Sequence, residues 1–357
     1  GIDLHALLID ERISVNYAEL IGLDARLYKE TPQSQLNIQS IIDALSPKDK
    51  NKPPTKFDLK VNNIVIRNSS VKYDVLSEAI DSLKLDVNHI LISDFNADVR
   101  LPRIKNDDFT AEIKRFTLRE KSGLTLSNLS GDFHITNNGS TLQSLSIQFP
   151  ESHITFADIE LNYDGWNNLL QGLKQHSVTL KTLNNSHVSL SDFRGLSPAL
   201  ENFDATLSLE IDITGTLDTL SINELAISSQ EANIYLTVNG TLNNIMNVDS
   251  IRADIKELSL KGYGSDIADI LLLNRKISPK GASVLSKLGQ ISFDGKIKGT
   301  PHLADVDGYL NTSNGNVALH AQIVRPLRSK TITFTGKIDG NDVNIGNIIS
   351  NNDLGKI

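Results

Sequence analysis

The sequence has no cysteine, few aromatic residues and no long apolar run, and each absence removes a class of protein. Without cysteine, the 357-residue chain has no disulfide, no thiolate metal site and no cysteine nucleophile. Aromatic residues make up 5% of the chain, which favours an aliphatic lining of any apolar surface over a pocket with aromatic anchors. No apolar run approaches the roughly 20 residues of a membrane-spanning helix. The composition is that of a folded protein.

Positive charge is also scarce. The formal net charge is -8 and the isoelectric point is about 5.5. Because nucleic-acid binding depends on a basic face that displaces counterions, we expect no nucleic-acid partner. The sequence opens with Gly1 and shows no basic signal-peptide region, so we expect an internal fragment whose membrane anchor or export signal lies upstream.

The clearest pattern in the chain is strict alternation of apolar and polar residues. The apolar residues Leu207, Leu209, Ile211 and Ile213 occupy every second position. Period two places alternate side chains on opposite faces of a strand, so this segment predicts a half-buried strand. The same reading predicts strands at Phe57-Leu59-Val61, Leu83-Leu85-Val87, Phe95 to Leu101, Phe109 to Ile113, Ile159 to Tyr163, Ile234-Leu236-Val238, Ile251 to Ile255 and Val317 to Ala321.

Asn-Gly and Asp-Gly pairs lie between many of these strands. Such pairs readily supply the positive φ angles of a tight hairpin, so they predict a mainly antiparallel, meandering sheet. The pairs are Asn138-Gly139, Asn239-Gly240, Asp294-Gly295, Asp307-Gly308, Asn314-Gly315 and Asp339-Gly340. The segment Phe293 to Gly299 also recurs loosely as Phe334 to Gly340, which suggests that one hairpin unit is reused.

Helical patterns are few. Apolar residues at helical spacing predict helices over Asn37–Leu45, Trp166–Leu173 and Ser265–Leu288, the last broken at Pro279. The charged and proline-containing stretch from Ser46 to Lys56 predicts a linker. We therefore divide the chain into residues 1–50, the end of a preceding β-repeat unit with a short helix; residues 51–175, a groove segment; and residues 176–357, a second groove segment with a helical insert near 265–288.

The sequence offers no convincing catalytic site. His187, Ser189, Ser191 and Asp192 form the densest polar cluster, but they lack a nucleophile elbow, and on a strand the first three would share one solvated face. Asp305 to Gly308 and Asp339 to Asp342 lack the glutamate that closes a calcium loop and predict hairpin turns instead. No zinc motif or phosphate-binding loop is present. We expect a non-catalytic protein with no metal and no cofactor.

The repeated apolar face is the functional feature that remains. It could pack against a second sheet in one or more β-sandwiches, or it could line an open, curled sheet that binds acyl chains. Period-two alternation does not distinguish these alternatives. For the open sheet, the expected lipid-binding residues are Leu59, Val61, Leu85, Val87, Leu207, Leu209, Ile211, Ile213, Ile234, Leu236 and Val238.

Several segments resemble the TamB/AsmA-like family of bacterial envelope proteins. The resemblance is carried by loose β-repeat patterns at Phe57–Ile66, Val71–Asp74, Glu120–Leu124, Leu129–Ile135, Leu145–Ile154 and Leu209–Leu225. It implies a curled β-sheet with a hydrophobic groove, in a protein anchored to the inner membrane and crossing the periplasm of a Gram-negative cell. It also implies a role in moving phospholipid toward the outer membrane, or in assembling outer-membrane proteins beside a BamA-like barrel that other regions of the protein would contact.

These observations predict a mainly β protein built as an elongated, curled antiparallel sheet with a few short helices. We expect its apolar groove to shield phospholipid acyl chains without catalysis. The alternative is an exported structural or adhesive β-solenoid or β-sandwich. A solenoid requires coils of fixed length, whereas the strand intervals here vary. A lipid-facing outer-membrane barrel would need aromatic girdles, and the chain has only seven tyrosines and one tryptophan.

Overall fold

The computed structural model shows a mainly β protein with one large, open, mixed sheet and a few short helices. The fold class predicted from the alternation is therefore confirmed. The structure describes residues 13–39, 59–80, 85–105, 108–165, 168–196, 205–229, 231, 233–247, 250–273, 277–324, 333–351, 353 and 355–356. The chain divides into two compact units, an N-terminal unit of residues 1–169 and 189–204 and a C-terminal unit of residues 170–188 and 205–357.

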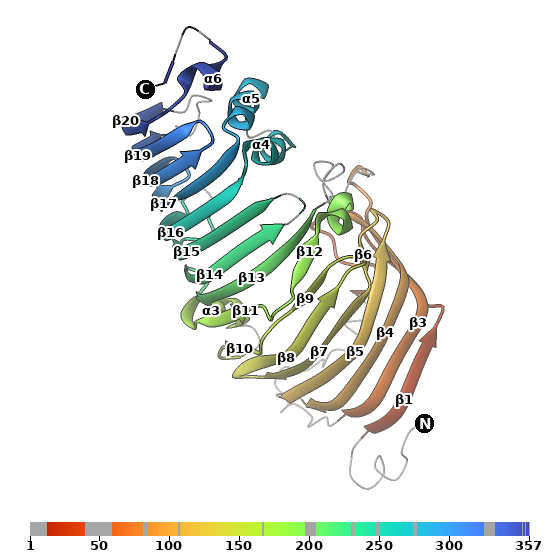
Figure 1. Ribbon diagram of the computed structural model, residues 1–357. Helices are drawn as coiled ribbons and strands as arrows, with labels where there is room; N and C mark the ends of the chain where they lie inside the picture. Colours follow the sequence, from red (N-terminus) through yellow and green to blue (C-terminus); the bar gives the residue numbers. More distant parts are fainter. Residues whose placement is uncertain are drawn as a thin grey trace. The chain divides into compact units, whose positions relative to one another are not determined.

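The N-terminal unit is a sheet in which most strands pair with their neighbours in sequence (Figure 1). Its strands are β1 (Ile13–Ile21), β2 (Asp24–Lys29), β3 (Leu59–Val75), β4 (His89–Lys105), β5 (Asp108–Glu120), β6 (Thr125–Leu126), β7 (Asn128–Thr136), β8 (Gly139–Gln148), β9 (His153–Thr155) and β10 (Ile159–Asn162). The 3-10 helix η2 (Leu190–Leu196) follows the short strand β12 (His187–Ser189).

The C-terminal unit is a regular antiparallel meander. Its strands are β11 (Val178–Lys181), β13 (Thr206–Gly215), β14 (Thr219–Ser229), β15 (Ile234–Asn243), β16 (Arg252–Tyr263), β17 (Gln290–Thr300), β18 (Leu303–Thr312), β19 (Gly315–Val324) and β20 (Thr333–Asn341). From β13 to β20 each strand pairs with the next in sequence, and β11 pairs with β13.

The sheet is mixed because two strands run parallel to their neighbour. β1 pairs with the first half of β3 and β2 with the second half, both in parallel. The two short strands are separated at Gly22, whose φ of +68° lies in the left-handed region that glycine adopts without strain. Asn68 in β3 and Asp94 in β4 also have positive φ angles, of 48° and 51°. The pairing of β3 and β4 is interrupted by register shifts, which period-two alternation does not predict.

Four of the six Asn-Gly and Asp-Gly predictions are wrong. Asn138-Gly139 and Asn314-Gly315 do lie at hairpins, between β7 and β8 and between β18 and β19. The other four pairs lie inside β15, β17, β18 and β20, at Asn239-Gly240, Asp294-Gly295, Asp307-Gly308 and Asp339-Gly340. The reason is local crowding: a Cβ at Gly240 would lie 2.5 Å from the carbonyl oxygen of Asp254, and one at Gly295 would lie 2.4 Å from that of Asp307.

The strand expected over Leu83-Leu85-Val87 is also wrong where the structure describes it. Leu85 and Val87 precede β4 in a non-strand connection, and Val87 is 67% exposed in a turn. In this connection Asp86 accepts a hydrogen bond from the backbone N–H of Asn88 at 3.0 Å. This aspartate turn competes with strand formation, and the turn outweighs the tendency of the three alternating apolar residues to form a strand.

The helices follow the sequence prediction in part. The segment 265–288 forms α4 (Gly264–Leu273) and α5 (Pro279–Lys287), and Pro279 occupies the first turn of α5 behind the cap Ser278. The predicted helix near Trp166 is α3 (Leu169–Gln175), and a further short helix, α6 (Ile345–Ile349), follows β20. Most of the helix expected over 37–45 lies outside the described residues.

Candidate apolar binding face

Strand register aligns the apolar residues of the C-terminal unit into rows that cross the sheet. Cross-strand partners share a face, so a row can be followed from strand to strand. One row contains Leu209, Ile227, Leu236, Leu260, Phe293, Leu310 and Val317. The next contains Ile211, Leu225, Val238, Leu258, Gly295, Gly308, Leu319 and Ile338. A third contains Leu180, Ile213, Ile222, Gly240, Ile255, Ile297, Val306 and Ala321. We call this surface the apolar face.

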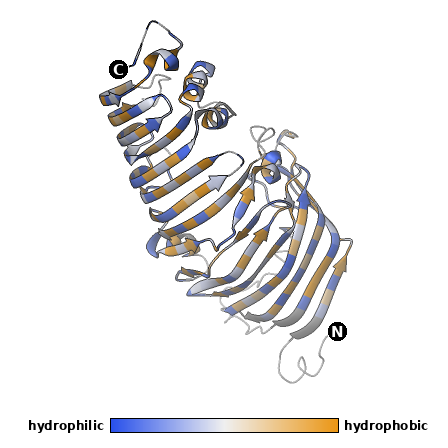
Figure 2. Cartoon of the chain, in the orientation of Figure 1, coloured by the Kyte–Doolittle hydropathy of each residue, from blue (hydrophilic) through white to orange (hydrophobic). Residues whose placement is uncertain are grey.

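Most side chains of the apolar face are half-buried. Leu209, Ile211, Leu236 and Val238 are only half-buried, and Ile338 in β20 is 55% exposed. In a β-sandwich these inward residues would be buried by a facing sheet about 10 Å away. The strands form a single open sheet instead. Figure 2 shows the resulting alternation of apolar and polar bands along the strands.

The third row contains several buried side chains. Ile222, Ile255 and Ala321 in this row are buried, with 9%, 9% and 7% of their surface exposed. Rows of half-buried residues lie on both sides of them, because Leu220, Leu242 and Ala253 follow on the next row. The rows on either side of this buried line are mostly half-buried.

Phe293 fills a gap that two glycines leave in this surface. Gly295 and Gly308 are cross-strand partners on the apolar face. The Cζ atom of Phe293 lies 2.7 and 2.8 Å from the positions that Cβ atoms would take on Gly295 and Gly308. The ring thus covers the backbone where the row has no side chains. The Asp-Gly sequences at these two positions leave space on the apolar face for the Phe293 ring. They do not form turns.

Helix α4 closes the apolar face at one end of the strands. Ile234, Gly262 and Ile291 belong to the row nearest α4. A Cβ on Gly262 would meet the side chains of Ile234 and Ile267 of α4, each at 3.5 Å. Ile291 is only 4% exposed. The row that contains the predicted residue Ile234 is therefore partly covered by helix, unlike the rows of Leu209 and Ile211.

The N-terminal unit carries a comparable face. Ile64, Val99 and Ile113 are successive partners in β3, β4 and β5, and Ile66, Ala97 and Phe116 form the adjacent row. The Phe116 ring packs edge-on against Phe95, with centroids 5.2 Å apart.

The structure brings most of the predicted site residues onto these two faces. The apolar face of the C-terminal unit includes Leu207, Leu209, Ile211, Ile213, Leu236 and Val238. Leu59 and Val61 lie in β3, paired with Ile104 and Leu101 of β4. Leu85 and Val87 lie in the connection before β4 and not on a strand.

Bulges explain why sequence patterns missed many residues of the apolar face. In β14 the residues of this face change from even to odd positions at Asn223-Glu224, and in β16 they change from odd to even at Lys256-Glu257. A period-two search breaks at each bulge. The residues missed for this reason are Leu220, Ile222, Leu225, Ile227, Leu258 and Leu260.

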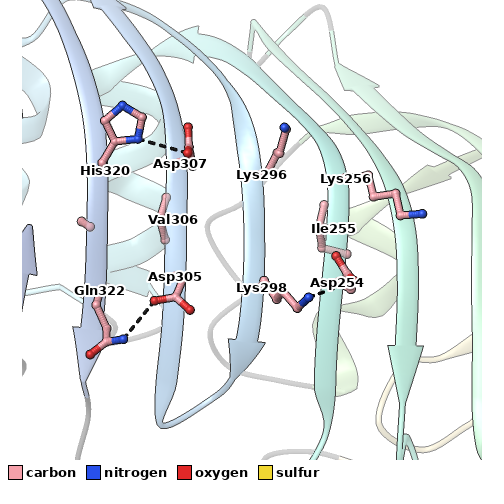
Figure 3. Close-up of a pocket in the computed structure, with 11 residues that line it drawn as sticks. Asp254, Ile255, Lys256, Lys296, Lys298, Asp305, Val306, Asp307, His320 and Gln322 are labelled. Carbon is pink, nitrogen blue, oxygen red and sulfur yellow. Dashed lines mark hydrogen bonds and ion pairs between the residues drawn. The ribbon is translucent and has the colours of Figure 1, made fainter.

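The opposite face of the same strands is charged and hydrogen-bonded. His320 Nδ1 lies 3.0 Å from Asp307 Oδ2, and Lys298 Nζ lies 3.7 Å from Asp254 Oδ2 (Figure 3). Residues of this face line most of a hollow of about 450 Å³ over β16 to β19. Positive and negative groups alternate there, so the hollow has no single sign of charge. We interpret it as solvated sheet surface.

The surroundings of Asp212 and Glu120 favour the ionised carboxylate. On the polar face of β13, hydrogen bonds from Lys181 and Asn223 hold the pKa of Asp212 below its ordinary value. In the N-terminal unit, burial alone would raise the pKa of Glu120, but hydrogen bonds to Glu120, including those from the backbone N–H groups of Ser122 and Leu91, outweigh burial and lower it. Both carboxylates stabilise backbone irregularities next to the strands.

The polar cluster around His187 does not share a strand face. β12 ends at Ser189, and Ser191 and Asp192 lie in η2, so the predicted common face is wrong. Ser152 Oγ donates to Asp192 Oδ2 at 2.5 Å and accepts from the backbone N–H of Ser189 at 2.9 Å. These bonds fasten η2 to the turn that contains Ser152.

The described part of the chain contains neither a metal-binding cluster nor a membrane-spanning helix. No group of three or more His, Asp or Glu side chains there is placed to hold a metal ion. None of its helices is both long enough and apolar enough to cross a bilayer. In comparisons with known proteins, the chain has no significant match to a protein-family model, a curated protein or a solved structure.

Proposed function

We propose that the apolar faces of this protein bind phospholipid acyl chains and shield them from water, without catalysis. The observation that carries this proposal is the alignment of aliphatic residues across β13 to β20 on a face that is not covered by a second sheet. A single-layer sheet with one aliphatic face is costly to leave in water, since each Å² of apolar surface contributes about 25 cal/mol when it is buried. Contiguous exposed apolar surface of this kind marks a binding site.

The chemistry of the face favours acyl chains over a compact ligand. The rows consist of Leu, Ile, Val, Ala and Gly, with Phe293 as their aromatic member in β17, and they offer no directional polar group. Burial in such a surface stabilises a flexible hydrocarbon by about 0.8 kcal/mol for each CH₂ and does not fix its position along the row. That suits a ligand that slides along the sheet better than one that is captured tightly.

The antiparallel meander also argues against the alternative of a β-solenoid. Solenoid coils stack parallel strands at a fixed repeat, whereas β13 to β20 alternate in direction. The setting of the proposal comes from the family resemblance: a Gram-negative periplasm, an inner-membrane anchor outside this segment, phospholipid movement between the membranes, and a BamA-like barrel as partner in outer-membrane protein assembly.

Photo-crosslinking tests the proposal residue by residue. A photo-reactive amino acid at position 209 or 211 would lie on the apolar face, while one at 210 would lie on the opposite face of the same strand. We expect mass spectrometry to find phospholipid attached at 209 and 211 and not at 210. Equal capture at 209 and 210, or none at any of the three in folded protein, would refute the assignment.

A further inference from the structure

Within the described residues, β20 lies at the edge of the sheet of the C-terminal unit. All nine residues of this strand are exposed. Its register with β19 runs without a bulge from Thr333 to Asn341, and within the described residues β19 is its only strand partner. An edge strand carries a row of unpaired backbone N–H and C=O groups, which proteins usually protect with proline, bulges, short length or charged side chains, especially lysine. β20 is nine residues long and has no proline and no bulge, and its charges at Lys337 and Asp339 are of opposite sign; β11 at the opposite edge has four residues.

The sequence of β20 is complementary to itself in one antiparallel register. When two copies pair about Ile338, that residue meets the partner's Ile338 on the apolar face, and Gly336 meets the partner's Gly340. On the polar face, Lys337 then lies opposite the partner's Asp339, and Asp339 opposite the partner's Lys337. Side chains that lie directly opposite each other in this register project from the same face of the joined sheet. The apolar face of one copy therefore continues into the apolar face of the other, and the polar face into the polar face.

Charge selects this register over its neighbours. Centring the pair on Lys337 places it opposite the partner's Lys337, and centring on Asp339 places two carboxylates together. Like charges directly opposite each other destabilise a strand pair. Within one copy, Lys337 Nζ lies 2.7 Å from Asp339 Oδ2, and both side chains are more than half exposed. They are therefore free to form a group of four alternating charges with a second copy.

We propose that a second copy of this chain docks antiparallel on the edge of β20, centred on Ile338. The two sheets then join into one, and the apolar face passes from one copy into the other through the paired Ile338 side chains. A junction only one strand wide buries less surface than a standard protein interface, so the dimer is weak and depends on concentration. The proposal does not depend on what the apolar face binds.

Charge reversal gives the first test. Lys337→Asp and Asp339→Lys each place like charges opposite one another in the dimer, and the double variant restores opposite charges. By sedimentation velocity up to about 1 mM protein, the range of weak complexes, we expect the wild type and the double variant to dimerise and each single variant to dimerise about tenfold more weakly. Circular dichroism should show all four folded. A monomeric wild type, or a double variant no better than the singles, would overturn the proposal.

Introduced cysteine gives an independent test, because the natural chain has none. Ile338→Cys places two thiols opposite each other at the two-fold axis, where cross-strand Cα atoms are about 4.5–5.5 Å apart, a spacing that a disulfide can span. Tyr309→Cys on β18, 65% exposed in the wild type, is the matched control. We expect Ile338→Cys to form a covalent dimer under mild oxidation at least tenfold faster than Tyr309→Cys. Equal rates would contradict the docking register.

Discussion

Asn223 Nδ2 donates a hydrogen bond to Asp212 Oδ1 at 3.0 Å, which ties the bulge of β14 to the regular strand β13. Lys181 of β11 donates to the other carboxylate oxygen of Asp212 at 2.7 Å. Asn239 of β15 extends the chain of contacts by donating to the backbone carbonyl of Asn223, also at 2.7 Å. Asp212 thus connects four strands on the polar face, directly behind the buried row of the apolar face.

Replacement of Asp212 should destabilise the C-terminal unit. Asp212→Ala removes the acceptor for both Lys181 and Asn223, and hydrogen bonds to a charged group contribute about 1.5–3 kcal/mol. Because the site is partly exposed, we expect a loss of about 1–2 kcal/mol in the free energy of unfolding, measured by urea denaturation. Glu210→Ala, an exposed change on the same face of β13, should cost less than about 0.5 kcal/mol. Equal effects of the two variants would contradict this role.

Acid should loosen the connection between β3 and β4. A hydrogen bond from Lys72, aided by one from His89, holds the pKa of Asp74 below its ordinary value of 3.8. A carboxyl group with a lowered folded-state pKa stabilises the fold above that value, and this contribution is lost as the pH falls through the folded pKa. We expect protection of the Val75 and His89 amides from hydrogen exchange to fall below about pH 4. Asp74→Asn should have lower protection at pH 7 and a smaller further loss on acidification.

Removing the ring of Phe293 should expose the glycine pair beneath it. Phe293→Ala uncovers the backbone of Gly295 and Gly308, and large-to-small changes of this kind cost up to about 3–5 kcal/mol in a full core. Because Phe293 is only half-buried, we expect about 1–3 kcal/mol by thermal or urea unfolding. Tyr309→Ala, on the opposite face of β18, should cost less than about 0.5 kcal/mol. A smaller effect at Phe293 than at Tyr309 would show that the ring does not cover the gap.

Charge on the apolar face should abolish acyl binding without unfolding the sheet. Leu209→Asp places a carboxylate in the row of Ile227 and Leu236, where an acyl chain would have to desolvate it at a cost of several kcal/mol. Because Leu209 is only half-buried in the free protein, the empty face can keep that charge hydrated. We expect folded Leu209→Asp protein to lose phospholipid from organic extracts, while Glu210→Lys retains it. If both variants retain lipid equally, acyl chains do not lie along this row.

The sequence predicts well which side chains share one face of a regular strand. It predicts bulges, turns and strand direction less well. The alternation from Leu207 to Ile213 predicts its strand and its shared face because β13 has no bulge of its own. The same logic fails in β14 and β16, where one extra residue at a bulge reverses the alternation. It also fails for Asp294-Gly295, because a glycine that makes room for Phe293 has the same sequence as one that forms a turn. Period two carries no strand direction, so the parallel pairing of β1 and β2 with β3 could not be predicted.

The meander from β13 to β20 has a consequence for how the chain reaches its native state. Each strand finds its partner in the strand just made, and most of the loops to be closed are short, the exception being the connection through α4 and α5 between β16 and β17. The unit can therefore be built progressively from its N-terminal side as the polypeptide emerges from a ribosome or a translocation pore. A hairpin can also be gained or lost in evolution with little effect on the others, because each strand contacts only its neighbours. The number of strands in such a sheet can therefore change easily.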